Sequence, residues 1–213
     1  MSGALTHSPA PLRAARALRR GATRAASVMA HLAGWTYIAC ALFITFDIVA
    51  RAFLGFSSQA TVEVTGYMLA GGIAWGLAHT LIRRAHIRVD VFANRLPVRL
   101  RAPLHILSLA LLTALGVLIA WSAWELVDES ALFDAHDNSA LRILLVWPQG
   151  IWAFGISAFV VTCCVLLLEA CLALAAGQGA SLDGLLGSRT LEDETEEALE
   201  AVAMAHEGEA PRR

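Results

Sequence analysis

A short basic segment between two long apolar stretches constrains this chain more than any other feature. Residues 83–101 hold six of its sixteen basic residues, and all sixteen are arginines. Short basic loops between membrane-spanning stretches stay in the cytoplasm, as the positive-inside rule describes. We therefore expect residues 83–101 to lie on the cytoplasmic side of a membrane, with one span before them and one after.

The composition agrees with a protein that lies mostly within a membrane. Hydrophobic residues make up 57% of the chain and charged residues 16%, and the mean hydropathy is +0.61. Soluble domains carry about 25% charged residues. The chain has no nucleotide-binding, zinc-protease or serine-hydrolase motif and no basic, aromatic-interleaved nucleic-acid surface. We therefore expect an all-α, polytopic membrane protein that is not an enzyme.

Four apolar stretches predict four transmembrane helices, because about 20 residues are needed to cross a hydrocarbon core about 30 Å thick. The expected spans are residues 28–50, 61–82, 104–127 and 148–170. They divide the chain into a basic arm at 1–27, a membrane domain at 28–176 and an acidic tail at 177–213. The polar connection between spans three and four is expected at 128–142, and Glu169 is expected to be solvated at the inner boundary.

Charge segregation predicts that both termini are cytoplasmic. The arm and the 83–101 loop together hold eleven arginines, whereas the two opposite connections hold only Arg51 and Arg142. This bias indicates an N-in, C-in orientation. Within the loop, an apolar helical face predicts a short amphipathic helix in the membrane surface, ending at Pro97. That face is formed by Val89, Phe92, Ala93 and Leu96.

The arm itself has two open interpretations. Arginines at positions 13, 16, 20 and 24 share one helical face, and Leu12 and Ala15 lie off that face. Such a segment is either a helix on an anionic lipid surface or a flexible arm that only sets orientation.

Ionisable groups near the outer boundary are candidate structural or transport residues. Asp47 and Arg51 are spaced for an ion pair along span one, and Glu63 begins span two. They form either a salt-bridged clamp between these spans or a set of interfacial groups. Gly72 and Gly76 form a small-residue pattern that favours close helix packing in lipid.

Histidines offer an alternative function. His31, His79 and His105 are all expected near the inner boundary, and paired histidines between helices can hold a haem. Interfacial histidines that reach water are the ordinary explanation, and we expect neither a cofactor nor a metal. The four cysteines lie in apolar stretches, where small packing residues are the simpler interpretation.

A family resemblance rests on several short motifs in order. Trp-Gly-Leu-Ala at 75–78 precedes a segment that runs from His86 through Val-Asp, ending at Asp90, and then Leu-Pro, ending at Pro97. Asp47, Arg51 and Glu63 fit the same pattern, as does Ser-Ala-Leu-Arg ending at Arg142. Over residues 28–176 the chain resembles the DctQ-like small membrane subunit of a tripartite ATP-independent periplasmic (TRAP) transporter.

The resemblance implies a non-catalytic subunit in the bacterial inner membrane. Its partners would be a large membrane subunit, which imports an organic acid, and a periplasmic substrate-binding protein. The 83–101 helix would anchor the chain at the cytoplasmic face, and the Gly72–Gly76 face would be a candidate contact with the large subunit. The alternative is a haem-binding membrane anchor of a respiratory oxidoreductase. The sequence names neither the substrate nor a role for the acidic tail.

Overall fold

The described part of the chain consists of helices and short connections. The structure is a computed structural model that describes residues 10–56, 60–84, 98–138 and 141–177, with Thr195, Leu199 and Val202. Its helices are α1 (Ala10–Leu54), α2 (Thr61–Ile82), α4 (Val98–Leu132) and α5 (Val146–Ala175). Over these residues the β pairing is a single bridge between His136 and Leu144. The all-α expectation is confirmed, whereas the expected surface helix lies outside the described residues.

The helices contain the expected spans, and three of them are longer than expected. α2 has the bounds predicted from sequence, 61–82. α1 reaches back through the basic arm to Ala10, so its 45 residues extend about 67 Å at 1.5 Å per residue. Residues 10–27 are therefore helical, which agrees with the helical interpretation of the arm. α4 begins before Pro103, which lies inside the helix and removes one intrahelical hydrogen bond.

Three helices are long and apolar enough to cross a membrane. They are α1, α4 from Arg101 onward, and α5. α2 is not among them, although its 22 residues would extend about 33 Å. Glycines, together with Glu63 and His79, lower the hydropathy of α2. The fourth span and the N-in, C-in orientation remain predictions.

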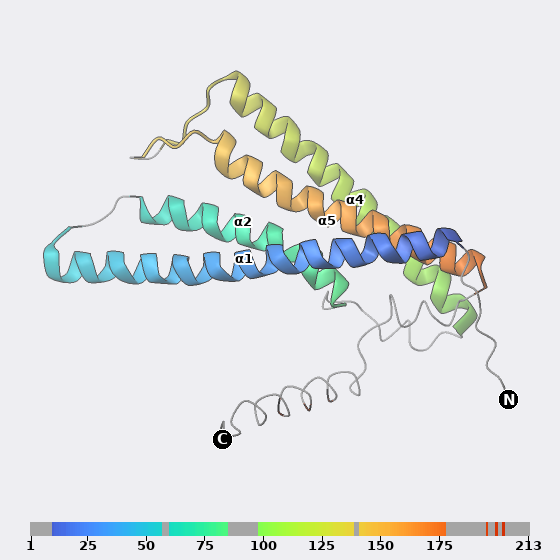
Figure 1. The fold of residues 1–213 in the computed structure, drawn as a ribbon. Helices are drawn as coiled ribbons and strands as arrows, with labels where there is room; N and C mark the ends of the chain where they lie inside the picture. The colour runs from blue at the N-terminus through green and yellow to red at the C-terminus, as the bar shows by residue number, and fades with distance from the viewer. Residues whose placement is uncertain are drawn as a thin grey trace.

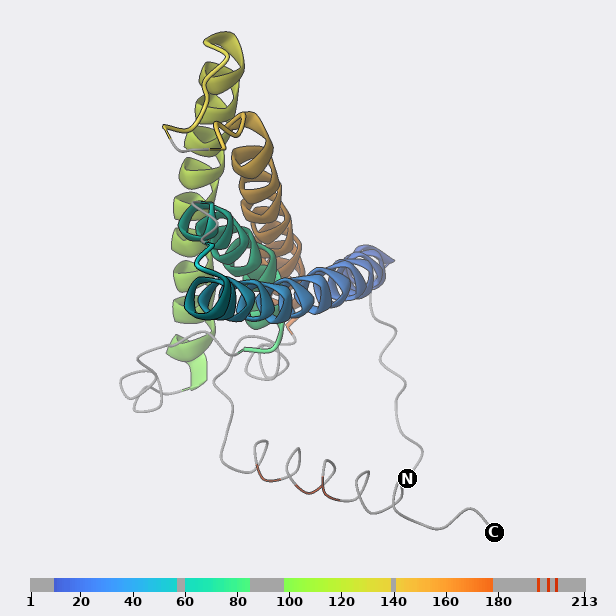
Figure 2. The ribbon, with the colours of Figure 1, turned by 90° about the vertical axis from the view of Figure 1, so that its left-hand side faces the viewer.

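The helices form two neighbouring pairs. α1 lies beside α2, α4 lies beside α5, and α5 also contacts both α1 and α2 (Figure 1). The two pairs meet where α1 begins and α5 ends, and they diverge toward the opposite ends of these helices (Figure 1). In the turned view, the nearer ends of α4 and α5 lie above α2, and α2 lies above α1 (Figure 2).

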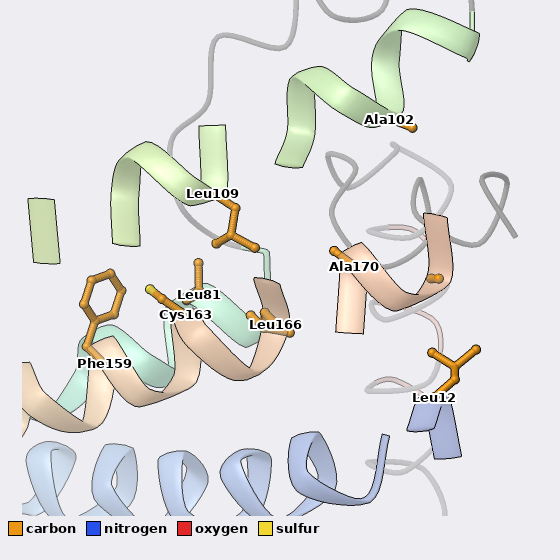
Figure 3. Packing of buried hydrophobic residues seen from close by; sticks show 9 residues of the cluster. Leu12, Leu81, Ala102, Leu109, Phe159, Cys163, Leu166 and Ala170 are labelled. Carbon is orange, nitrogen blue, oxygen red and sulfur yellow. The ribbon is translucent and has the colours of Figure 1, made fainter. Parts of the chain in front are cut away.

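The core lies where the two pairs meet. All four helices contribute to it, with Leu12 from α1, Leu81 from α2, Leu109 from α4, and Cys163 and Leu166 from α5 (Figure 3). Leu12 and Cys163 are both 0% exposed. Burial of Leu12 fixes the first turns of α1 against the end of α5, because an apolar side chain this size gains about 1.5–3 kcal/mol when it leaves water.

The connections at the diverging end are short. α1 ends at Leu54, and Gly55 follows with a φ of 65°, a left-handed conformation that glycine adopts without a steric cost. α4 continues to Leu132, so the polar connection to α5 begins at Phe133 rather than at residue 128 as expected. In this connection the Asp137 N–H donates to the Ile143 carbonyl at 2.9 Å. This bond and the His136–Leu144 bridge make it a folded turn.

Candidate functional site

The outer-boundary candidates form an ion pair within one helix. Arg51 donates to the Asp47 carboxylate at 2.8 Å, and Asp47 is 3% exposed while Arg51 reaches solvent. Because Gly72 of α2 lies against Tyr37 in this antiparallel pair, Asp47 lies at the level of residue 62, beside Glu63. Among the described residues, Oε2 of Glu63 is buried without a hydrogen-bond partner. The ion pair therefore belongs to α1, and the three groups share one end of the α1–α2 pair.

A cavity opens where the two helix pairs diverge. It has a volume of about 440 Å³, and its walls come from α1, α2 and the start of α5. Thr36, Met68, Trp147 and Ile151 are among its mostly apolar lining residues. The shape and lining suit an apolar group, not a charged substrate.

Two polar groups on the cavity wall are already used to join elements. The Trp75 indole N–H donates to the Ile151 carbonyl at 2.9 Å. The Tyr67 hydroxyl donates a short hydrogen bond to the Asp137 carboxylate. The first bond joins α2 to α5, and the second joins α2 to the α4–α5 connection. From the sequence, Asp137 is expected only as part of the polar connection at 128–142. Neither bond is predicted, because the two partners of each bond are more than 65 residues apart in the chain.

The two packing glycines have different surroundings. A side chain at Gly72 would begin 2.8 Å from the Tyr37 ring, so the space is filled by α1. At Gly76 no heavy atom of the described structure lies within 4 Å of that position. Gly72 therefore serves packing within this chain, and Gly76 lies open.

A further close contact joins the two helix pairs. A Cβ at Gly155 of α5 would lie 2.9 Å from the backbone carbonyl carbon of Ala74 in α2. Only a glycine allows this approach, so Gly155 fixes the point where α2 crosses α5. In sequence Gly155 stands alone, and no motif singles it out.

A buried charge near the inner end of α5 contradicts an expectation from sequence. Glu169 is 4% exposed instead of solvated, and Arg19 donates to it at 2.7 Å. Arg16 lies 3.9 Å from the other carboxylate oxygen. The first turns of α1 lie against α5 beside this carboxylate, and Arg19 is 150 residues from Glu169 in the chain, so periodicity does not indicate the contact.

The histidines that the structure describes lie in separate surroundings on different helices. His31 Nδ1 lies 2.7 Å from the Ser27 carbonyl oxygen, one turn earlier in α1. Nδ1 of His79 is buried with no hydrogen-bond partner, and His105 is buried in α4. The structure, over its described ranges, holds no group of three His, Cys, Asp or Glu side chains that could bind a metal. No geometric observation favours the haem alternative.

The remaining candidates are separated or lie outside the described residues. Arg142 is exposed in the α4–α5 connection, with a φ of 45°. His86, Asp90 and Pro97 fall in residues 85–97, which the structure does not describe. The structure thus pairs Asp47 with Arg51, has Glu63 at the same end of the α1–α2 pair, and leaves Arg142 on a different connection.

Comparison with protein families places most of the chain within a known family model. The model for tripartite ATP-independent periplasmic transporters, DctQ component, matches residues 40–174. This stretch includes the end of α1, all of α2 and α4, and nearly all of α5. No curated protein and no solved structure matches the chain.

Proposed function

Since this chain belongs to the DctQ-component family of tripartite ATP-independent periplasmic transporters, we propose that it supports the large membrane subunit and helps dock the binding protein during import of an organic acid. The match over residues 40–174 is the observation that carries this proposal. It covers all of α2 and α4, nearly all of α5 and the end of α1, so the proposal concerns more than one helix pair.

A supporting role agrees with the use of the polar groups in the membrane domain. Trp75 and Tyr67 both line the cavity, and the polar atom of each donates a hydrogen bond to another element: Trp75 to α5 and Tyr67 to the α4–α5 connection. A transport path needs polar groups that stay available for the substrate. We therefore assign the substrate path and its ion coupling to the large subunit.

The exposed face of α2 is our candidate contact with the large subunit. One stripe, about 120° wide, holds the exposed positions of the helix, since most of them recur at three- and four-residue intervals. These positions are Val62, Gly66, Leu69, Ala70, Ile73 and Thr80, and the half-buried Gly76 lies at one edge of the same stripe. A side chain at either glycine would meet no heavy atom within 4 Å in the described structure, so a second helix has room to approach.

The diverging ends are our candidate docking region for the binding protein. In the N-in orientation they face the periplasm of a bacterium, and they expose Arg51 and Arg142 beside apolar groups such as Phe53 and Phe133. The Tyr67–Asp137 bond holds the connection that carries Arg142. Mixed arginine and aromatic surfaces are typical of protein interfaces. At the cytoplasmic face, His86, Asp90 and Pro97 belong to the proposed anchor helix.

A tagged pull-down from the native host tests the proposal. The full chain is solubilised in mild detergent, purified by its tag, and its companions are identified by mass spectrometry. We expect a larger polytopic membrane protein, with or without a periplasmic binding protein. A coloured eluate with flavin or iron–sulfur companions would contradict the proposal and support the haem anchor.

A further inference from the structure

The first turns of α1 carry a feature that the family match does not include, because that match begins at residue 40. We propose that Arg13, Arg20 and Arg24 form a binding surface for the headgroups of anionic phospholipids in the cytoplasmic leaflet. The proposal rests on the N-in orientation proposed above, and it requires no particular transport partner.

Contacts with α5 hold these turns near the membrane boundary. Leu12 and Ala15 are buried, at 0% and 1% exposure, and Arg19 pairs with Glu169. Glu169 lies six residues before the end of α5, whose apolar stretch ends at the inner boundary. A helix standing upright would place Arg13 about 22 Å below residue 28. Instead the start of α1 packs against the end of α5 (Figure 1), where Leu12 shares a cluster with Ala170 and Ala173. In the N-in orientation this contact would keep the arginines of α1 close to the headgroups.

The three arginines form a narrow stripe on the side away from α5. Their spacings of seven and four residues place them within about 40° of one another around the helix axis. All three are exposed, whereas Leu12, Ala15 and Ala26 bury the opposite part of the surface. α1 can therefore stay packed against α5 while the three arginines remain accessible to a binding partner.

Electrostatics indicate what the partner is. Like charges one helical turn apart repel each other, and an anionic surface removes this repulsion. Anionic lipids attract each arginine near the surface with an energy equivalent to about a fivefold gain in affinity. Three arginines together would give a gain on the order of a hundredfold.

The acidic tail of this chain is the competing occupant. Residues 192–209 contain eight acidic side chains and lie on the same predicted side of the membrane. We favour lipid because contacts within the described structure already place the stripe beside the inner boundary, where headgroups surround it at high local concentration.

Binding of a fluorescent phosphatidylglycerol to the purified full chain tests the proposal. The probe is titrated in mixed micelles with phosphatidylcholine, and its fluorescence anisotropy is followed at low and high salt. The test variant is Arg13→Gln/Arg20→Gln/Arg24→Gln, which leaves Arg16, Arg19 and Leu12 unchanged. A charge-matched control is Arg189→Gln/Arg212→Gln/Arg213→Gln, which removes three arginines from the tail.

We expect the test variant to bind on the order of a hundredfold more weakly than the wild type, and the control to bind within about threefold of it. High salt should remove most of the difference. Equal binding by the test variant and the wild type would overturn the proposal. It would also be overturned if the full chain failed to bind while a chain ending at residue 177 bound tightly, since the tail would then occupy the stripe. Either result leaves the pull-down unaffected, so the two proposals fail separately.

Discussion

Trp75 of α2 donates its indole N–H to the backbone carbonyl of Ile151 in α5, with nitrogen and oxygen 2.9 Å apart. Its ring also lies 5.7 Å from that of Phe154, centroid to centroid. One turn along α5, Gly155 has no side chain, and a Cβ there would lie 2.7 Å from Cδ1 of Trp75. Together these contacts fix the crossing of α2 and α5, which joins the two helix pairs.

Gly155→Ala should push α2 and α5 apart at their point of closest contact. The added methyl group would meet the Ala74 backbone and the Trp75 ring, so neither helix can avoid it by moving a flexible side chain. Overpacking of this kind costs about 1–3 kcal/mol of unfolding free energy. Thermal unfolding in detergent should show a clear decrease in the midpoint.

Gly150→Ala is the matched control on the same helix. No heavy atom of the described structure lies within 4 Å of a Cβ at Gly150, and alanine favours a helix over glycine by about 1 kcal/mol. The control should therefore unfold at the wild-type temperature or higher. If both variants lost the same stability, Gly155 would not be a crossing point.

Replacements at Gly72 and Gly76 should have opposite consequences. Gly72→Leu must displace the Tyr37 ring, so it should lower the stability of the purified chain by about 1–3 kcal/mol. Gly76→Leu has open space and should leave the purified chain stable. If the α2 stripe contacts the large subunit, Gly76→Leu should nevertheless reduce co-purification of that subunit at least severalfold.

Co-purification that is unchanged in Gly76→Leu would remove this face from the proposed interface. Leu69→Ala is a useful companion, because it removes apolar contact from the same stripe without adding bulk. A stable chain that loses its partner in both variants would place the contact on α2.

The sequence predicts the helices well because each span has a local signal. The apolar run at 61–82 gives both ends of α2, and the i+4 spacing of Asp47 and Arg51 predicts the ion pair that the structure contains. Helix lengths outside the apolar runs were less predictable. The hydropathy of residues 10–27 gives no reason to extend α1, and its first turns depend on burial of Leu12 against α5.

Most of the contacts that the sequence does not predict join residues far apart in the chain. Glu169 appears at the end of an apolar stretch, where solvation is the natural expectation, and only the fold brings Arg19 to it. Tyr67 and Asp137 lie 70 residues apart, and neither belongs to a motif. The Gly72–Gly76 pattern does predict close packing, but it does not say which of the two glycines packs within the chain.

Tyr67→Phe should loosen the α4–α5 connection. The variant keeps the ring against the cavity and removes only the hydroxyl that donates to Asp137. A hydrogen bond to a charged group contributes about 1.5–3 kcal/mol. Hydrogen–deuterium exchange should increase at the amides of Asp137 and Leu145, which donate within this connection, and stay unchanged in the middle of α5. Tyr37→Phe, on α1, is the matched control. Equal exchange rates in both variants would show that the Tyr67–Asp137 bond does not hold the connection in place.

Replacing Arg16 and Arg19, the partners of Glu169, should lower the free energy of unfolding more than replacing Glu169 itself. In Arg16→Gln/Arg19→Gln the carboxylate stays buried without its two cations, and an uncompensated buried charge costs about 3–5 kcal/mol. In Glu169→Gln the two arginines can turn to water, because their side chains are 37% and 36% exposed, so the loss should be smaller. The triple variant Arg16→Gln/Arg19→Gln/Glu169→Gln should therefore regain part of the stability that the double variant loses.

These three variants and the wild type form a mutant cycle. It is measured by thermal unfolding and by limited proteolysis of residues 10–24. Non-additive losses of at least about 1 kcal/mol would show that the three charges act as one unit. Proteolysis should be fastest in the double variant, because the arm then leaves α5. Additive losses, or cleavage at the wild-type rate in all variants, would mean that burial of Leu12 and Ala15 alone holds α1 in place.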